Sequence, residues 1–187
     1  MRVLSVVCAV FFLSSCTAGP SEAPKDAAPA AAVPQLPAPQ PGGTLAELMR
    51  GIPFPNSNII FDAQTVDPGA AKLADKAGPD AKATDKFGGL YGGWQGLENS
   101  AVALQEVANL LVIPGRMCEN GRPAPLDRED WPKFVQGLRE AGVASYKAAK
   151  SRSQDAMIEV SGTVADACAA CHEVYRDKPD NKDRCIP

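Results

Sequence analysis

Apolar residues recur at helical spacing in four stretches of this chain, and the alternation typical of strands is absent. The first stretch starts at Thr44 with Glu47 three residues later, the pattern of a capping box at a helix N-terminus. Pro53 and Pro55 predict an interruption, after which residues 57–64 resume the helix or form a turn. The apolar positions before the prolines share one helical face: Leu45, Leu48, Met49 and Ile52.

The other three stretches are longer. A seam of apolar residues at intervals of three and four predicts a helix over 94–113, which ends where Pro114 follows. The next helix is expected to begin after Asp130 as N-cap, with Pro132 in its first turn. The last begins near Ser153. Four amphipathic helices without strands predict an all-α fold, an antiparallel four-helix bundle.

Residues 1–16 have the features of a secretory signal rather than of a folded domain. Arg2 precedes an apolar run over 3–13 that is too short to span a bilayer. The run ends in Leu-Ser-Ser-Cys, which resembles the lipobox of bacterial lipoproteins and makes Cys16 the predicted lipidated residue. An ordinary signal peptide cleaved near residues 17–19 is the alternative. Acyl chains on Cys16 would hold the protein at a membrane surface.

Residues 17–43 are rich in Ala and Pro, carry little charge and lack a core-forming pattern. Such a composition predicts an extended tether outside the fold. The folded domain is therefore expected over 44–187.

The charge balance is acidic. The chain has 19 Lys and Arg against 22 Asp and Glu, a net charge of −3. Loss of residues 1–15 removes only Arg2 among the charged residues, which leaves 18 basic against 22 acidic residues and a net charge of −4. Because no Lys/Arg-rich tract is present, nucleic acid is not expected as a partner.

The single histidine follows directly on a Cys-x-x-Cys pair, in the run Cys168-Ala-Ala-Cys171-His172. This is the attachment motif of c-type haem. On a helix, spacings of three and four put all three side chains on one face, so that the thiols can join the haem vinyl groups while the imidazole binds iron. A zinc site would need a second Cys/His pair, and a thioredoxin-like motif a strand before the helix; neither is indicated. We therefore expect one covalent haem c, held by Cys168, Cys171 and His172.

The motif continues as Cys-His-Glu-Val-Tyr-Arg on the last predicted helix, and in this the chain resembles the cytochrome c′ family over about residues 44–187. The resemblance implies a haem protein on the periplasmic side of the bacterial cell envelope, with His172 as the proximal iron ligand and Arg176 near the haem. The family includes homodimers. The lipobox, the proline tether, the Pro53–Pro55 break and the long loop over 114–129 depart from the family pattern.

The sixth iron ligand is left open by the sequence. Bis-histidine ligation is excluded because His172 is the only histidine, and methionine is then the common alternative. In an up-and-down bundle the end of the last helix lies beside the start of the first and beside the second-to-third connection. This topology brings Met49 and Met117 near the haem, and Met49 falls where the family has its distal residue. Met49 is thus a candidate distal ligand, with core packing as its alternative role, and family members with an apolar residue at this place leave the iron open.

The same topology brings Cys118 close to Cys185, the two cysteines left after the signal and the haem motif are assigned. An even remainder in an exported protein predicts a disulfide, with two free thiols as the alternative. Arg116 and Arg122 in the same loop are expected either to pair with the haem propionates or to be solvated.

The expected function is one-electron transfer by a c-type cytochrome, not catalysis, with unidentified redox proteins of the cell envelope as partners. The alternative is a five-coordinate haem protein that binds nitric oxide or carbon monoxide at an open distal site. A peroxidase-like enzyme ranks last, because a distal histidine for acid–base chemistry cannot exist here.

Overall fold

A computed structural model describes residues 37–70 and 92–187. The signal over 1–16 and the tether up to residue 36 lie outside these residues. Within them the chain forms five α-helices, one short 3-10 helix and no strand, with only an isolated bridge between Met117 and Pro123. The predicted all-α class is thus confirmed for the described part. The helices are α1 Leu45–Gly51, α2 Pro53–Asp62, α5 Gly93–Leu110, α6 Trp131–Ser151, α7 Gln154–Tyr175 and η1 Asn181–Asp183.

The first stretch folds as two helices separated by a single residue. Thr44 caps α1 through the predicted capping box: the Glu47 carboxylate accepts the Thr44 amide at 2.8 Å, and the Thr44 hydroxyl accepts the Glu47 amide at 3.2 Å. The chain then resumes as a helix at once after Ile52, earlier than expected, with Pro53 at its first position. A proline costs nothing there, because the first-turn amides have no intrahelical acceptor.

Of the two N-caps predicted for the later helices, one forms its capping hydrogen bond and the other does not. Ser153 caps α7, its hydroxyl accepting the Ala156 amide at 3.2 Å. Asp130 precedes α6 as predicted, but its side chain makes no capping bond. Its carboxylate accepts the Tyr175 hydroxyl of α7 instead, at 2.5 Å.

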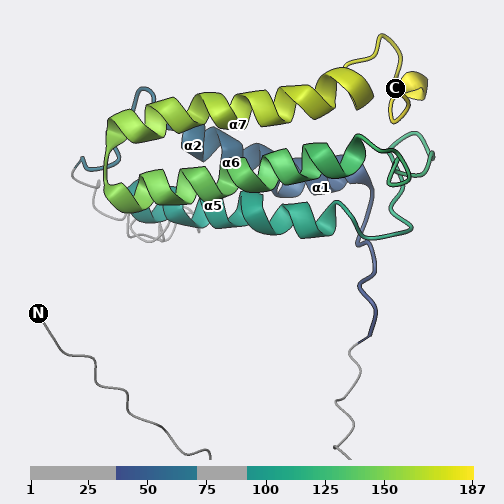
Figure 1. The fold of residues 1–187 in the computed structure, drawn as a ribbon, viewed down its shortest axis with the longest axis horizontal. Helices are drawn as coiled ribbons and strands as arrows, with labels where there is room; N and C mark the ends of the chain where they lie inside the picture. The colour runs from purple at the N-terminus through teal and green to yellow at the C-terminus, as the bar shows by residue number, and fades with distance from the viewer. Residues whose placement is uncertain (1–36, 71–91) are drawn as a thin grey trace, which may run out of the picture. The chain divides into compact units, whose positions relative to one another are not determined.

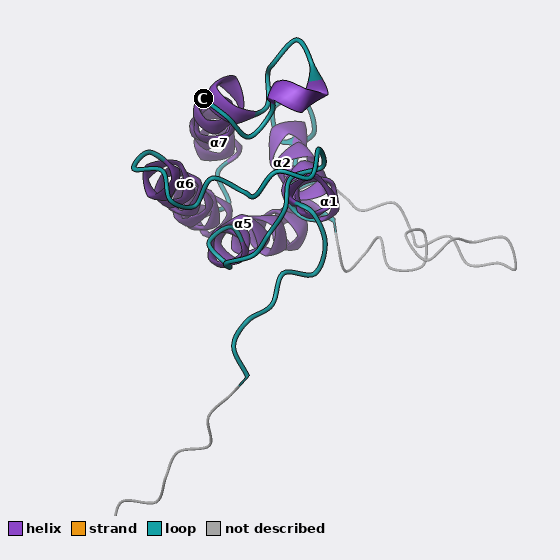
Figure 2. Cartoon of the chain, turned by 90° about the vertical axis from the view of Figure 1, so that its right-hand side faces the viewer, coloured by secondary structure: helices purple, strands orange, loops and turns teal. Residues whose placement is uncertain are grey.

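The long helices lie side by side in the order α5, α6, α7 (Figure 1). In the end-on view α2 lies beside α5 and α7 and contacts both helices (Figure 2). The core between them is apolar, and its most buried large side chains are Ile60, Leu104, Val107, Met157 and Val164. The core therefore takes residues from α2, α5 and α7, and α6 adds Val135 and Leu138.

The α1 helix packs differently from the others. None of its residues is buried, and its apolar side chains only flank the core. It is fastened mainly by polar contacts with the loop between α5 and α6: the Leu45 amide donates to the Met117 carbonyl at 2.8 Å, and Arg50 pairs with Glu119 at 2.7 Å. The α1 helix thus flanks the core and is linked to the loop by these polar contacts.

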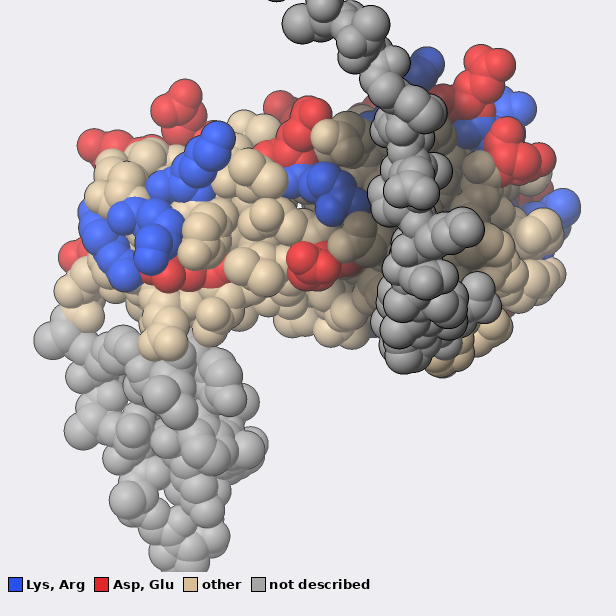
Figure 3. Space-filling view, turned by 60° about the horizontal axis from the view of Figure 1, so that its bottom comes forward, with Lys and Arg blue, Asp and Glu red and all other residues tan. Residues whose placement is uncertain are grey.

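The charged surface is mixed in sign. On the face drawn in Figure 3, Lys and Arg alternate with Asp and Glu and with broad uncharged areas. Local pairing contributes to this pattern, because Lys150 and Arg152 both lie within 4 Å of Glu98. None of the helices in the described segments has the length and apolar character needed to cross a bilayer.

Candidate haem site

The three residues of the Cys-x-x-Cys-His motif lie on the last two turns of α7 and line one cavity of about 620 Å³. Cys168, Cys171 and His172 are all half-buried, and the two cysteines are free thiols. Their helical spacing places them together on one side of α7, as the sequence predicts. Two nucleophilic sulfurs and an imidazole are thus presented to the same space.

Another wall of the cavity comes from α1 and α2. Met49 lies on this wall and is half-buried. Phe54 also lines it, although 69% of its surface is exposed, and Phe61 contributes further apolar surface. The wall therefore combines one thioether with aromatic side chains. Such a surface suits a large flat apolar group.

Of the described methionines, only Met49 lines the cavity. Met117 is 41% exposed on the loop, where its carbonyl accepts the Leu45 amide, and it is absent from the cavity wall. Met157 is fully buried in the core near the start of α7. The alternative distal ligand Met117 is therefore not placed with His172, whereas Met49 is.

The motif side chains are held in a partly desolvated environment. Burial lowers the pKa of His172, Arg176 lowers it further, and Asp177 raises it. Burial also raises the pKa of Cys168, and it raises that of Cys171 to about 11 together with the nearby Cys168 and Asp130. The neutral imidazole favoured by this environment is the form that binds a metal ion.

One end of the cavity is closed by a cap made of the loop residues 118–122 and the tail residues 180–185. A disulfide joins Cys118 to Cys185, the bridge expected from the cysteine arithmetic. The Asn120 side-chain amide donates to the carbonyls of Asn181 at 2.9 Å and Arg184 at 3.1 Å. Both cysteines of the bridge are buried. The cap is therefore a fixed part of the wall.

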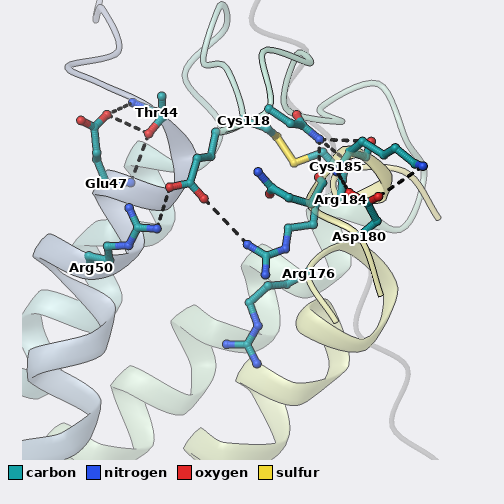
Figure 4. A network of polar contacts seen from close by, with 12 residues as sticks. Thr44, Glu47, Arg50, Cys118, Arg176, Asp180, Arg184 and Cys185 are labelled. Carbon is teal, nitrogen blue, oxygen red and sulfur yellow. Dashed lines mark hydrogen bonds and ion pairs between the residues drawn. A yellow bond between two sulfur atoms is a disulfide. The ribbon is translucent and has the colours of Figure 1, made fainter. Parts of the chain in front are cut away.

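Three arginines line the cavity, and only Arg176 was among the predicted site residues. Its Nε donates to Asp177 at 2.7 Å. Arg50 of α1 and Arg184 of the tail share the carboxylate of Glu119, at 2.7 and 3.8 Å (Figure 4).

The two loop arginines proposed as propionate partners lie elsewhere. Arg116 is only 3% exposed and donates to the carbonyls of Gly43 at 3.0 Å and Leu110 at 3.2 Å. Arg122 donates to the Lys182 carbonyl at 3.2 Å, within the cap. Neither lines the cavity, so neither expectation for Arg116 holds: its buried side chain links the loop to the residues before α1 and to the end of α5.

Aromatic side chains pack together next to the motif at the end of α7. Tyr175, one turn after His172, packs edge-on against Trp131 and Phe134, with ring centroids 5.6 and 6.2 Å apart. The Tyr175 hydroxyl is held by Asp130, and the Trp131 indole donates to the Leu111 carbonyl at 3.2 Å. Tyr175 and Trp131 both line the cavity, so its floor is rigid as well as apolar.

Sequence reasoning missed Trp131 as a cavity residue, since its apolar spacing on α6 marks it only as core. It also missed Arg50 and Arg184, because an arginine on a polar stretch looks the same whether it faces solvent or a cavity. Glu119 was missed for the same reason. No local pattern in the sequence distinguishes these three residues.

In the part of the chain that the structure describes, no group of three or more His, Cys, Asp and Glu side chains is arranged to hold a metal ion. No model of a known protein family matches this chain, and comparisons with characterised proteins and with solved structures likewise found no match.

Proposed function

We propose that this protein is a c-type cytochrome that carries one electron, with a single haem bound covalently at Cys168 and Cys171. The observation that carries the proposal is that both thiols and the only imidazole of the chain open on one large cavity. In this proposal the helices form an antiparallel four-helix bundle of the cytochrome c′ type, with the haem motif on the last helix.

The residues around the cavity fit such a group. A haem needs two thiols, an axial base, an apolar slot and partners for its two acidic side chains. The cavity offers Cys168 and Cys171, His172, the aromatic surface of Trp131 and Tyr175, and the arginine donors described above. The Arg184 guanidinium makes no hydrogen bond to another described residue and lines the cavity, so its terminal N–H groups are available to an acidic group bound there.

His172 is the proximal iron ligand in this proposal, and Met49 is the distal one. When bound, the haem supplies one-electron chemistry between its ferric and ferrous states. The chain's own contribution is to orient the imidazole on α7, to present the Met49 thioether from α1 and to exclude water with the aromatic floor. Histidine–methionine ligation and burial both raise a haem potential, which suits a carrier.

We also propose that the protein works on the periplasmic side of a bacterial cell envelope, anchored through a lipid on Cys16. Its partners would then be redox proteins of the same compartment, reached through the Ala/Pro-rich tether. The apolar run over residues 3–13 and the position of Cys16 shortly after it support this proposal.

The test is absorption spectroscopy of the full-length protein produced in a host that matures c-type cytochromes. Covalent haem, split ferrous bands, the methionine-to-iron charge-transfer band and no change with carbon monoxide are expected. A high-spin spectrum that shifts with carbon monoxide would replace the carrier with a gas-binding haem protein. A chain without covalent haem would overturn both functions.

A further inference from the structure

Arg184 has hydrogen-bonding capacity that the protein itself does not use. A guanidinium carries five N–H donors. The Nε of Arg184 is buried without an acceptor, and Nη1 lies 3.8 Å from Glu119 Oε2, which is too long for a hydrogen bond. The side chain is 41% exposed and lines the cavity. No nitrogen of the guanidinium donates to an acceptor among the described residues, so the terminal N–H groups are available to an acceptor in the cavity that Arg184 lines.

The backbone around Arg184 is fixed in place. The Arg184 amide donates to the Asn181 carbonyl at 3.2 Å, and the next amide, that of Cys185, donates to the Tyr175 carbonyl at 2.8 Å. The Arg184 carbonyl accepts the Asn120 side chain, and the disulfide follows at the next residue. The guanidinium is thus attached to a rigid segment rather than to a free tail, which lowers the entropic cost of binding through it.

Arg50 and Arg184 share the single carboxylate of Glu119, although over the whole cavity wall three arginines face three carboxylates, those of Glu119, Glu173 and Asp177. Glu119 faces two guanidinium groups, with Oε1 2.7 Å from Arg50 and Oε2 3.8 Å from Arg184 (Figure 4). The third cavity arginine, Arg176, already has Asp177 as its partner. The cluster of Arg50, Glu119 and Arg184 therefore carries one positive charge in excess at the cavity wall.

We propose that Arg184 binds a carboxylate of the haem, and that Glu119, held by Arg50, is the counter-charge that keeps Arg184 against the cavity. The inference rests on the proposed function, because the haem supplies the carboxylate. Arginine suits this role, since its planar fork donates two parallel hydrogen bonds to one carboxylate. The tail that the disulfide fixes to the loop thereby becomes part of the cofactor site.

The experiment compares three variants of the holoprotein, each checked for covalent haem. Arg184→Gln removes the charge and the fork, Arg184→Lys keeps the charge alone, and Lys133→Gln removes one charge from an exposed residue of α6 outside the cavity and the cap. The midpoint potential and the haem propionate-bending band in the resonance Raman spectrum are measured for each.

Arg184→Gln is expected to lower the midpoint potential, because a positive charge near the haem stabilises the more negative ferrous state. It is also expected to shift the propionate band. Arg184→Lys should return the potential close to that of the wild type, and Lys133→Gln should leave both quantities unchanged.

A propionate band at the wild-type position in Arg184→Gln would overturn the inference, since Arg184 would then be a nearby charge without contact. An equal change of potential in Lys133→Gln would overturn it too, because the effect would follow from net charge alone. Wild-type protein without covalent haem would instead refute the proposed function, so the two failures are distinguishable.

Discussion

Met49 on α1 and His172 on α7 line the same cavity, although the two residues belong to the first and last helices of the described domain. Neither helix alone carries both candidate iron ligands. The relationship depends on how the chain returns, so that the end of α7, the α1 helix and the cap all line one cavity.

Replacing Met49 tests this relationship directly. In haem-loaded Met49→Ala we expect the methionine-to-iron band to disappear and carbon monoxide to bind the ferrous protein, because the thioether is removed from the cavity wall. Absorption spectra of both oxidation states measure this. Leu48→Ala is the matched control, since Leu48 is also half-buried on α1 but does not line the cavity. Equal spectra for Met49→Ala and the wild type would show that another group, or none, binds iron there.

The Cys118–Cys185 bridge should matter for folding stability. Replacing both cysteines with serine is expected to reduce the free energy of unfolding by about 2–5 kcal/mol, as for native disulfides of small exported domains. Urea denaturation followed by circular dichroism measures the loss. The wild-type protein treated with a reductant in urea serves as the control, because thioether bonds resist reduction while the disulfide does not. An unchanged denaturation midpoint in the double variant would contradict the structural role of the bridge.

Gly142 of α6 lies in close contact with the α5 backbone. A methyl group added there would lie 2.9 Å from the Gln105 backbone nitrogen and 3.1 Å from the Ala101 carbonyl oxygen. Both are backbone atoms, so the helices must move apart, and we expect Gly142→Ala to cost about 1–3 kcal/mol.

Gly137→Ala on the same helix is the control with the opposite sign. A methyl group at Gly137 meets nothing within 4 Å, so its higher helix propensity should stabilise the protein by up to about 1 kcal/mol. Thermal denaturation of the two variants measures both changes in stability. If both were destabilised alike, the contact with Gln105 would not be the cause.

The capping box of α1 predicts a pH dependence. The hydrogen bonds from the Thr44 amide and hydroxyl hold the pKa of Glu47 below its ordinary value of 4.5. The ionised carboxylate therefore stabilises the folded state fully above pH 4.5, and this contribution is lost as the pH falls through the folded pKa. Melting temperatures measured from pH 6 downwards should show the wild type above Glu47→Gln at first and equal to it in acid. Glutamine keeps the hydrogen-bonding pattern but lacks the charge, so a constant difference at all pH values would exclude ionisation as its cause.

Much of the fold could be predicted from local patterns in the sequence, whereas the exact helix break and the long-range contacts could not. The apolar seams over 94–113 and after Asp130 and Ser153 predict their helices because each helix must bury one face. The break at Ile52 is narrower than the two prolines suggest, since Pro53 and Pro55 both fall in a first turn, where a missing amide is harmless. Asp130 keeps its position before α6, but its carboxylate accepts Tyr175, a long-range bond that no local pattern reveals.

Some residues of the candidate site could likewise be predicted from the sequence, and others could not. Cys168, Cys171 and His172 are found from spacing alone, and Cys118 with Cys185 from counting and topology. Glu119 and Arg184 are paired across 65 residues of chain, and only the disulfide and the Asn120 contacts bring their segments together. Arg116 looked like a solvated loop residue but is buried, because two carbonyls from different segments accept its donors.

The single-residue joint at Ile52 has a consequence for how this domain could change over time. The α2 helix contributes Ser57 and Ile60 to the buried interior, whereas α1 contributes no buried residue and lines the cavity through Leu45 and Met49. Within this short segment α2 both fills the buried interior and lines the cavity, whereas α1 lines the cavity without burying a residue. Substitutions on α1 could alter what binds beside His172 while the interior stays intact, so the ligand chemistry of this domain can vary without a new fold.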